Sequence, residues 1–105
     1  MKLGDARRAF TRLLPDLIRK AEELGFEPAI DYAKRCKDCS VGRSNSLHKD
    51  GLAIDLHLYR DGLYLPESEH HKELGAYWET LDNKCSWGGR FSDGNHYSFR
   101  IDMRR

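Results

Sequence analysis

Two short segments of this sequence carry the residue types of a metal centre. Residues 46–55 contain His48 and Asp55, and a later segment contains Asp93 and His96. Two histidines and one carboxylate are the ligand set of a catalytic zinc site that keeps one position open for water. Asp93 lies three residues before His96, where a carboxylate could serve that water as general base. We therefore expect His48, Asp55 and His96 to bind zinc.

The periodicity of two predicted strands suggests how these side chains meet. Apolar and polar residues alternate over residues 52–59, with Asp55 on the polar side, and again over residues 95–103, with His96 on the polar side. If the strands are antiparallel neighbours, Asp55 and His96 share one face and their apolar neighbours face the helices. His48 precedes the first strand and can fold back over that face. The alternative is that these histidines are surface residues and that Asp55 is a solvated or capping carboxylate.

Other polar residues could bind or orient a substrate. Arg35 ends a strand predicted over residues 27–35, where it could hold a carbonyl or carboxylate and stabilise the oxyanion formed on attack. Arg43, in a loop predicted over residues 34–45, competes for this role. Ser46 could hydrogen-bond the substrate or orient the ligand loop. The alternative for both arginines is a solvated charge.

The remaining histidines and the cysteines carry weaker signals. His57 shares the predicted face of Asp55, where it could support the site or be a partly exposed strand histidine. His70 and His71 have no third ligand beside them, so we expect both to be solvated. The odd number of cysteines argues against a disulfide framework. We expect free structural thiols, with one disulfide or metal or redox chemistry as alternatives, at Cys36, Cys39 and Cys85.

Helical periodicity predicts the elements that would cover the sheet. An apolar face recurs at helical spacing before Gly25, but Pro15 interrupts it, and proline suits the first position of a helix better than its interior. Trp78, Trp87 and Tyr97 are expected in the core or the wall of a cleft, together with Phe91. The elements predicted are helices over residues 5–13, 15–24 and 66–81, a turn at 60–62 with a hairpin arm at 63–65, and a glycine-hinged loop at 87–91.

Length and composition limit the partners. A chain of 105 residues forms one domain with a modest core, to which a bound metal would add stability. A net charge of +1 makes no case for nucleic-acid binding, and Arg7 and Arg8 are expected to be solvated. No apolar run is long enough for membrane insertion, and the first residues lack the apolar core of a signal peptide. We expect a monomer that is made in the cytoplasm.

Both segments also resemble the motifs of a known family. Ser46-x-His48-x-x-Gly51-x-Ala53-x-Asp55 resembles the SxHxxGxAxD signature of the LAS-type zinc peptidases, which include D-alanyl-D-alanine dipeptidases and carboxypeptidases and phage L-alanyl-D-glutamate endolysins. Trp87-Gly88-Gly89-x-Phe91-x-Asp93-x-x-His96 resembles the closing motif of the endolysin branch. The resemblance covers residues 26–99. It places the zinc ligands on His48, Asp55 and His96, the catalytic base on Asp93 and the family arginine on Arg35.

The resemblance implies both a fold and an activity. The fold would be α+β of the Hedgehog/D-Ala-D-Ala peptidase type, with helices on one side of an antiparallel sheet. Residues 1–105 would form a single catalytic domain without a separate cell-wall-binding domain. The activity would be that of a hydrolase, a zinc metallopeptidase that cleaves peptidoglycan stem peptides at the L-alanyl-D-glutamate bond. As in a bacteriophage endolysin, it would reach the wall after holin-assisted release.

Two other activities stay open. One is a D,D- or L,D-carboxypeptidase of the cell wall, in which Arg43 or Lys49 would capture a terminal carboxylate. The other is a non-catalytic binding module that carries zinc, as Hedgehog signalling domains do. Asp93 argues against the binding module, because such a module needs no general base.

Overall fold

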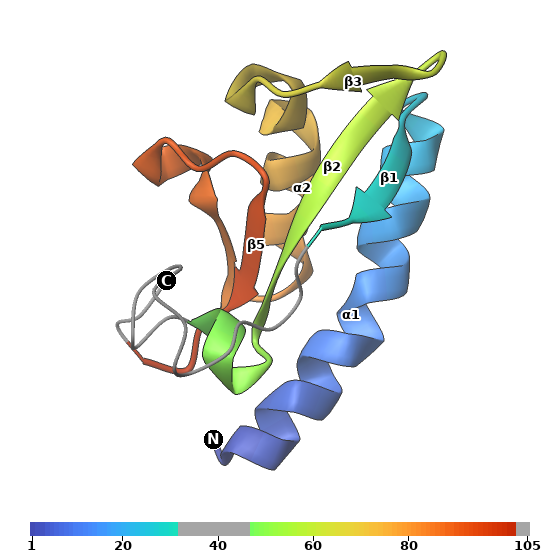
Figure 1. Ribbon diagram of the computed structural model, residues 1–105. Helices are drawn as coiled ribbons and strands as arrows, with labels where there is room; N and C mark the ends of the chain where they lie inside the picture. The colour runs from blue at the N-terminus through green and yellow to red at the C-terminus, as the bar shows by residue number, and fades with distance from the viewer. Residues whose placement is uncertain (32–46, 103–105) are drawn as a thin grey trace.

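The structure of this chain is a computed structural model that describes residues 1–31 and 47–102, except the side chains of His48 and Lys49. Helices and an antiparallel sheet make it an α+β protein (Figure 1). The elements in chain order are α1 (Leu3–Glu23), β1 (Glu27–Ile30), η1 (Leu47–Asp50), β2 (Ala53–Arg60), β3 (Leu63–Leu65), η2 (Ser68–His71), α2 (Lys72–Leu81), β4 (Cys85–Trp87), η3 (Gly88–Phe91) and β5 (His96–Phe99), where η marks a 3-10 helix.

The sheet is built around β2, its longest strand. Its order is β1-β2-β5-β4, and β3 pairs with the C-terminal half of β2. Every pairing between the described strands is antiparallel. The strand predicted over residues 52–59 is confirmed within one residue. The strand predicted over residues 95–103 is too long, because β5 ends at Phe99, and the strand predicted over residues 27–35 is observed over Glu27–Ile30 and leaves the described residues after residue 31.

A two-residue turn joins β2 to β3. Asp61 and Gly62 have φ angles of 53° and 79°, and Arg60 pairs with Leu63 across the turn. Positive φ at both central residues is the type I′ geometry, whose twist matches that of the flanking strands and which Asp-Gly favours. The predicted turn and hairpin arm are therefore confirmed.

The first helix is continuous, and the prediction of two helices broken at Pro15 is wrong. Pro15 lies inside α1 and is exposed, and so is Thr11 one turn earlier. Because proline has no backbone N–H, the Thr11 carbonyl lacks the donor that it would have in a regular helix. Water can reach that carbonyl. The lost hydrogen bond is outweighed by one continuous apolar face, whose buried residues are Ala6, Phe10, Leu17 and Ala21. None of the helices in the described part of the chain is long and apolar enough to cross a membrane.

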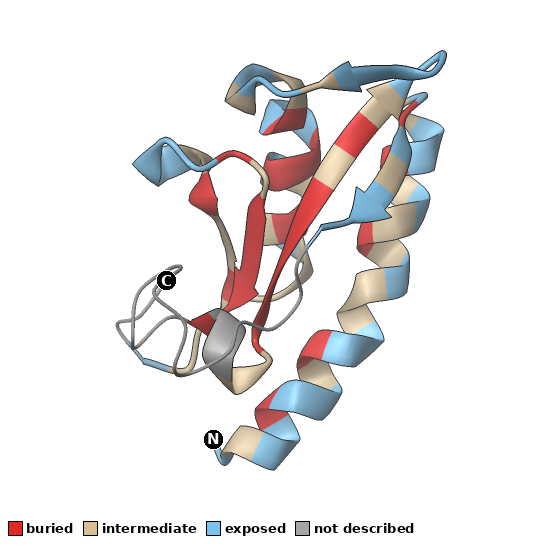
Figure 2. Cartoon of the chain, viewed as in Figure 1, coloured by how far each residue is buried: buried red, intermediate tan, exposed pale blue. Residues whose placement is uncertain are grey.

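Both long helices pack on one face of the sheet. Trp78 of α2 lies edge-on against Phe10 of α1 and against Tyr97 of β5, with ring centroids 5.9 Å and 6.4 Å apart. Buried residues accordingly follow β2, β5 and the helix surfaces that oppose them (Figure 2). The core therefore lies between the sheet and the two helices.

The segment between β3 and β5 differs from its prediction in two places. The helix predicted over residues 66–81 begins as the 3-10 turn η2 and becomes α-helical only at Lys72. The sequence pattern did not indicate β4, and the glycine-containing loop predicted over residues 87–91 is a strand end followed by η3. Strand β4 has three residues, and its pairing with β5 defines it, so it is too short for periodicity to show.

Candidate metal centre

Asp55 and His96 lie directly opposite each other on β2 and β5. Their neighbours Ile54 and Tyr97 form the adjacent pair in the same register. Tyr97 packs on Trp78, so the Ile54–Tyr97 pair faces the helices. Because directly opposed residues share a face and successive residues alternate, Asp55 and His96 project from the other face. The predicted shared face is confirmed.

The two side chains are close and buried. His96 Nδ1 lies 3.6 Å from Asp55 Oδ1, and the residues are 6% and 4% exposed. This separation exceeds that of an N–H···O hydrogen bond. Two ligand atoms of one tetrahedral zinc ion are about 3.4 Å apart, given bonds of about 2.1 Å. The carboxylate and the imidazole therefore fit a shared zinc ion in both type and spacing.

Asp93 brings a second carboxylate to the same imidazole. Its Oδ2 lies 3.9 Å from His96 Nδ1, and its side chain is 59% exposed. The backbone N–H of His96 donates to the Asp93 carbonyl at 3.1 Å. This hydrogen bond closes a turn that brings the two side chains together. A solvent-accessible carboxylate beside a buried histidine suits a group that exchanges protons with water.

The third predicted ligand, His48, is described only through its backbone. It lies in η1, immediately before β2, and the Leu52 N–H donates to the Leu47 carbonyl at 2.9 Å. The part of the chain with described side chains contains no group of three His, Cys, Asp or Glu residues that could hold a metal ion. Asp55 and His96 therefore supply two donors that fit zinc, and the role of His48 as the third stays a prediction.

An arginine of α1 attaches to the segment that carries His48. Arg7 Nε donates to the Asp50 carbonyl at 2.7 Å, across 43 residues of sequence. Arg7 is exposed, as expected, and its hydrogen bond to Asp50 is a further contact that the sequence did not predict. No local pattern could indicate this contact, because only the packing of α1 beside η1 creates it.

The predicted substrate-binding residues Arg35, Arg43 and Ser46 lie outside the described residues, as do the loop predicted over residues 34–45 and two cysteines, Cys36 and Cys39. Cys85 is a buried free thiol, as expected. Burial, with a smaller contribution from Asp82, raises its pKa to about 12, so the thiol stays protonated.

His57 is a partly exposed strand histidine. Its Nε2 lies 3.3 Å from Asp31 Oδ2, its side chain is 30% exposed, and its ring packs edge-on against Tyr64. These contacts favour the interpretation of His57 as a partly exposed strand histidine over the interpretation in which it supports the metal site.

His71 is buried, so the expectation of a solvated histidine is wrong. It is 2% exposed, and its Nδ1 shares a hydrogen bond of 2.7 Å with the Tyr97 hydroxyl. Burial, followed by the nearby His70 and His57, lowers the pKa of His71 to about 4. Its spacing to Leu74 and Trp78, three and seven residues further on, was a signal that could have placed it on the buried face.

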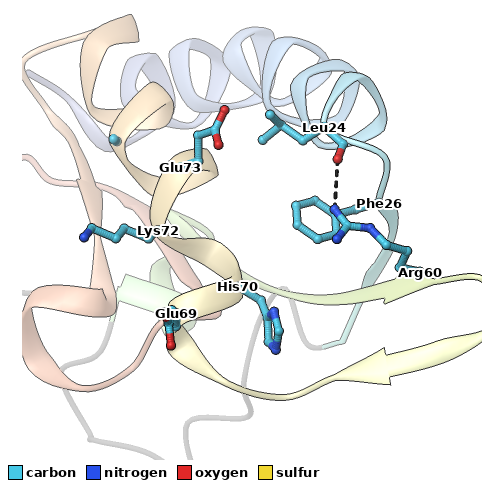
Figure 3. A pocket seen from close by; sticks show the side chains of 8 residues that line it. Leu24, Phe26, Arg60, Glu69, His70, Lys72 and Glu73 are labelled. Carbon is cyan, nitrogen blue, oxygen red and sulfur yellow. Dashed lines mark hydrogen bonds between the residues drawn. The ribbon is translucent and has the colours of Figure 1, made fainter.

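A separate hollow of about 560 Å³ opens between the end of α1 and the start of α2 (Figure 3). The Arg60 guanidinium stacks 4.4 Å from the centroid of the Phe26 ring and donates to the Leu24 carbonyl at 3.0 Å. These contacts tie the end of α1 to β2. The hollow is lined by Leu24, Phe26, Arg60, Glu69, His70, Lys72, Glu73 and Ala76, so no residue of the candidate metal centre takes part.

Comparison with known proteins does not add to this picture. No family model and no curated protein matches the sequence. Any assignment therefore depends on the motifs and on the geometry of the residues themselves.

Proposed function

We propose that this chain is a zinc metallopeptidase that cleaves peptidoglycan stem peptides at the L-alanyl-D-glutamate bond, with the Hedgehog/D-Ala-D-Ala peptidase fold of the phage endolysins. The main support is the register that sets Asp55 opposite His96, buried and 3.6 Å apart, on the face away from the helices. Asp93 adds an exposed carboxylate at 3.9 Å from the same imidazole. A buried carboxylate is unfavourable unless it is paired or binds a metal, and a carboxylate beside an imidazole is a donor pair that a zinc site uses.

The proposed mechanism assigns one task to each residue. Asp55 and His96, with His48, would hold zinc, whose chemistry would be to lower the pKa of a water molecule and to polarise the scissile carbonyl. Asp93 accepts the proton of the attacking water and later delivers it to the leaving amine nitrogen. Arg35 holds the negative charge that develops on the carbonyl oxygen. Ser46 and Arg43 would help to bind the peptide substrate.

The first prediction concerns the products of digestion. Zinc-loaded protein is incubated with purified Gram-negative peptidoglycan, and released fragments are identified by mass spectrometry. We expect free peptides that begin at D-glutamate. Asp93→Asn should retain zinc and the fold but release these peptides about 10²- to 10⁴-fold more slowly, the usual contribution of a general base.

A matched variant and two other products complete this experiment. Asp16→Asn makes the same change at an exposed α1 carboxylate that pairs with Arg19, and it should keep full activity. Loss of terminal D-alanine alone would reassign the chain to the carboxypeptidases. Zinc binding without release of any fragment would favour the binding module, and undiminished activity of Asp93→Asn would remove Asp93 as the base.

A further inference from the structure

Gly94, the residue that follows Asp93, is held through both of its backbone polar groups. The Gly94 N–H donates to Ser68 Oγ at 3.0 Å, and the Gly94 carbonyl accepts from Trp87 Nε1 at 2.6 Å. Ser68 belongs to η2 and Trp87 to β4, so two elements distant in sequence meet at one residue. Trp87 is directly opposite Tyr97 in the sheet, and its side chain therefore lies on the helix face.

The Trp87 side chain is itself held in a close-fitting place. Its ring lies against Gly75 of α2 and Gly89 of η3, and a Cβ atom built on either glycine would overlap the ring. The backbone N–H of Trp87 donates to Glu79 Oε2 at 3.0 Å, and the Glu79 carboxylate also pairs with the Arg90 guanidinium at 2.6 Å. The indole N–H is thus presented to Gly94 from a rigid support.

Every backbone polar group of Asp93 and Gly94 has a partner. The Asp93 N–H donates to the Gly88 carbonyl at 3.0 Å, and the Asp93 carbonyl accepts from His96. The two groups of Gly94 bind Ser68 and Trp87. A Cβ atom at Gly94 would overlap Ser68, so this close approach requires glycine. The backbone at Asp93 is therefore fixed while its carboxylate remains exposed to solvent.

We propose that Trp87 and Ser68 are positioning residues for Asp93, and that they act by clamping the backbone of Gly94. The inference rests on the proposed function, in which the Asp93 carboxylate must meet a water molecule near His96. An error of about 1 Å in the position of a reacting group can cost about 100-fold in rate. A general base on a short turn needs support from a rigid layer, which the helix face of the sheet supplies.

A first test measures the clamp without reference to activity. Amide hydrogen exchange of the full chain is followed by NMR in wild type, Ser68→Ala and Thr80→Ala. Ser68→Ala removes the acceptor, so exchange at the Gly94 amide should accelerate about fivefold or more, while the β2 amides keep their rates. Thr80→Ala removes a hydroxyl that bonds within α2, to Tyr77, and should leave Gly94 unchanged. Unchanged exchange at Gly94 in Ser68→Ala would overturn the clamp.

A second test asks whether the clamp acts through Asp93. Trp87→Phe and Ser68→Ala should each lower kcat about 10- to 100-fold and change KM less than about twofold. The same substitutions made in Asp93→Asn should have little further effect, because the group that they position is already lost. Trp78→Phe is the matched control: it removes an indole N–H that binds the Ser98 carbonyl at 3.1 Å, and its effect should be the same in both backgrounds.

The outcomes separate this inference from the proposed function. Suppose that the wild type is active and that Trp87→Phe and Ser68→Ala lower kcat by the same factor whether residue 93 is Asp or Asn. This result would overturn the positioning role but would leave the proposed peptidase activity intact. A wild type that cleaves no wall peptide would overturn the peptidase and the catalytic part of this proposal together. The exchange rates at Gly94 would then decide whether the clamp exists.

Discussion

At the scale of single residues, His71 is a neutral base kept inside the protein. Its ring bonds the Tyr97 hydroxyl, whose own pKa is raised by burial. Because the pKa of His71 falls from 6.5 to about 4 on folding, the unfolded chain binds a proton more readily than the folded one. The stability that His71 contributes is therefore complete above about pH 6.5 and is lost as the pH falls toward 4.

We expect the free energy of unfolding to be about 2 kcal/mol lower at pH 5 than at pH 7, measured by urea denaturation. His71→Asn, which cannot titrate, should remove most of this difference, whereas His70→Asn should keep it. Measurements stay at pH 5 or above because Glu79 also titrates in acid. Burial raises the pKa of Glu79, but the hydrogen bonds from the Arg90 guanidinium and the Trp87 backbone N–H outweigh this effect, so the pKa of Glu79 is lowered overall. Equal pH dependence in wild type and His71→Asn would contradict the assignment.

At the scale of elements, α1 retains a proline at a cost that its packing offsets. Pro15→Ala restores an N–H that can donate to the Thr11 carbonyl, and position 15 is exposed, so no packing is lost. We expect the variant to be about 1–3 kcal/mol more stable, since part of the gain is offset by greater freedom of the unfolded chain. Urea denaturation measures the change.

Arg12→Ala is the control for this prediction, because it alters an exposed α1 position without restoring a backbone hydrogen bond. Its stability should change by less than about 0.5 kcal/mol. A Pro15→Ala variant less stable than wild type would mean that the bend or φ constraint of proline is needed to seat α1 on the sheet.

At the scale of the whole molecule, the small core would make a bound metal an important part of stability. Zinc at about 100 times its Kd would add about 2.7 kcal/mol, or about 10 °C in Tm for a domain of this size. We expect a chelator to lower Tm by this amount, as measured by calorimetry. His96→Ala should abolish the difference between zinc-loaded and chelated protein, whereas His70→Ala should retain it. A zinc effect that survives His96→Ala would show that the metal binds elsewhere.

The sequence by itself determined the features that depend on local chemistry. Alternation over β2 and β5 assigned Asp55 and His96 to the polar side of their strands, because side chains on a strand alternate whatever surrounds it. Asp61 and Gly62 predicted the hairpin turn, because few residues accept positive φ. The three-residue spacing between Asp93 and His96 also singled out Asp93 as the candidate base.

Only the tertiary structure decided the features that depend on contacts between distant segments. The register of β2 with β5 set Asp55 3.6 Å from His96, and the packing of α1 kept its helix intact through Pro15. Burial against the sheet made His71 a neutral interior base. The contact of Trp87 with Gly94 joins β4 to the Asp93 turn. Burial and close approach arise when elements pack together, and local spacing carries little information about either.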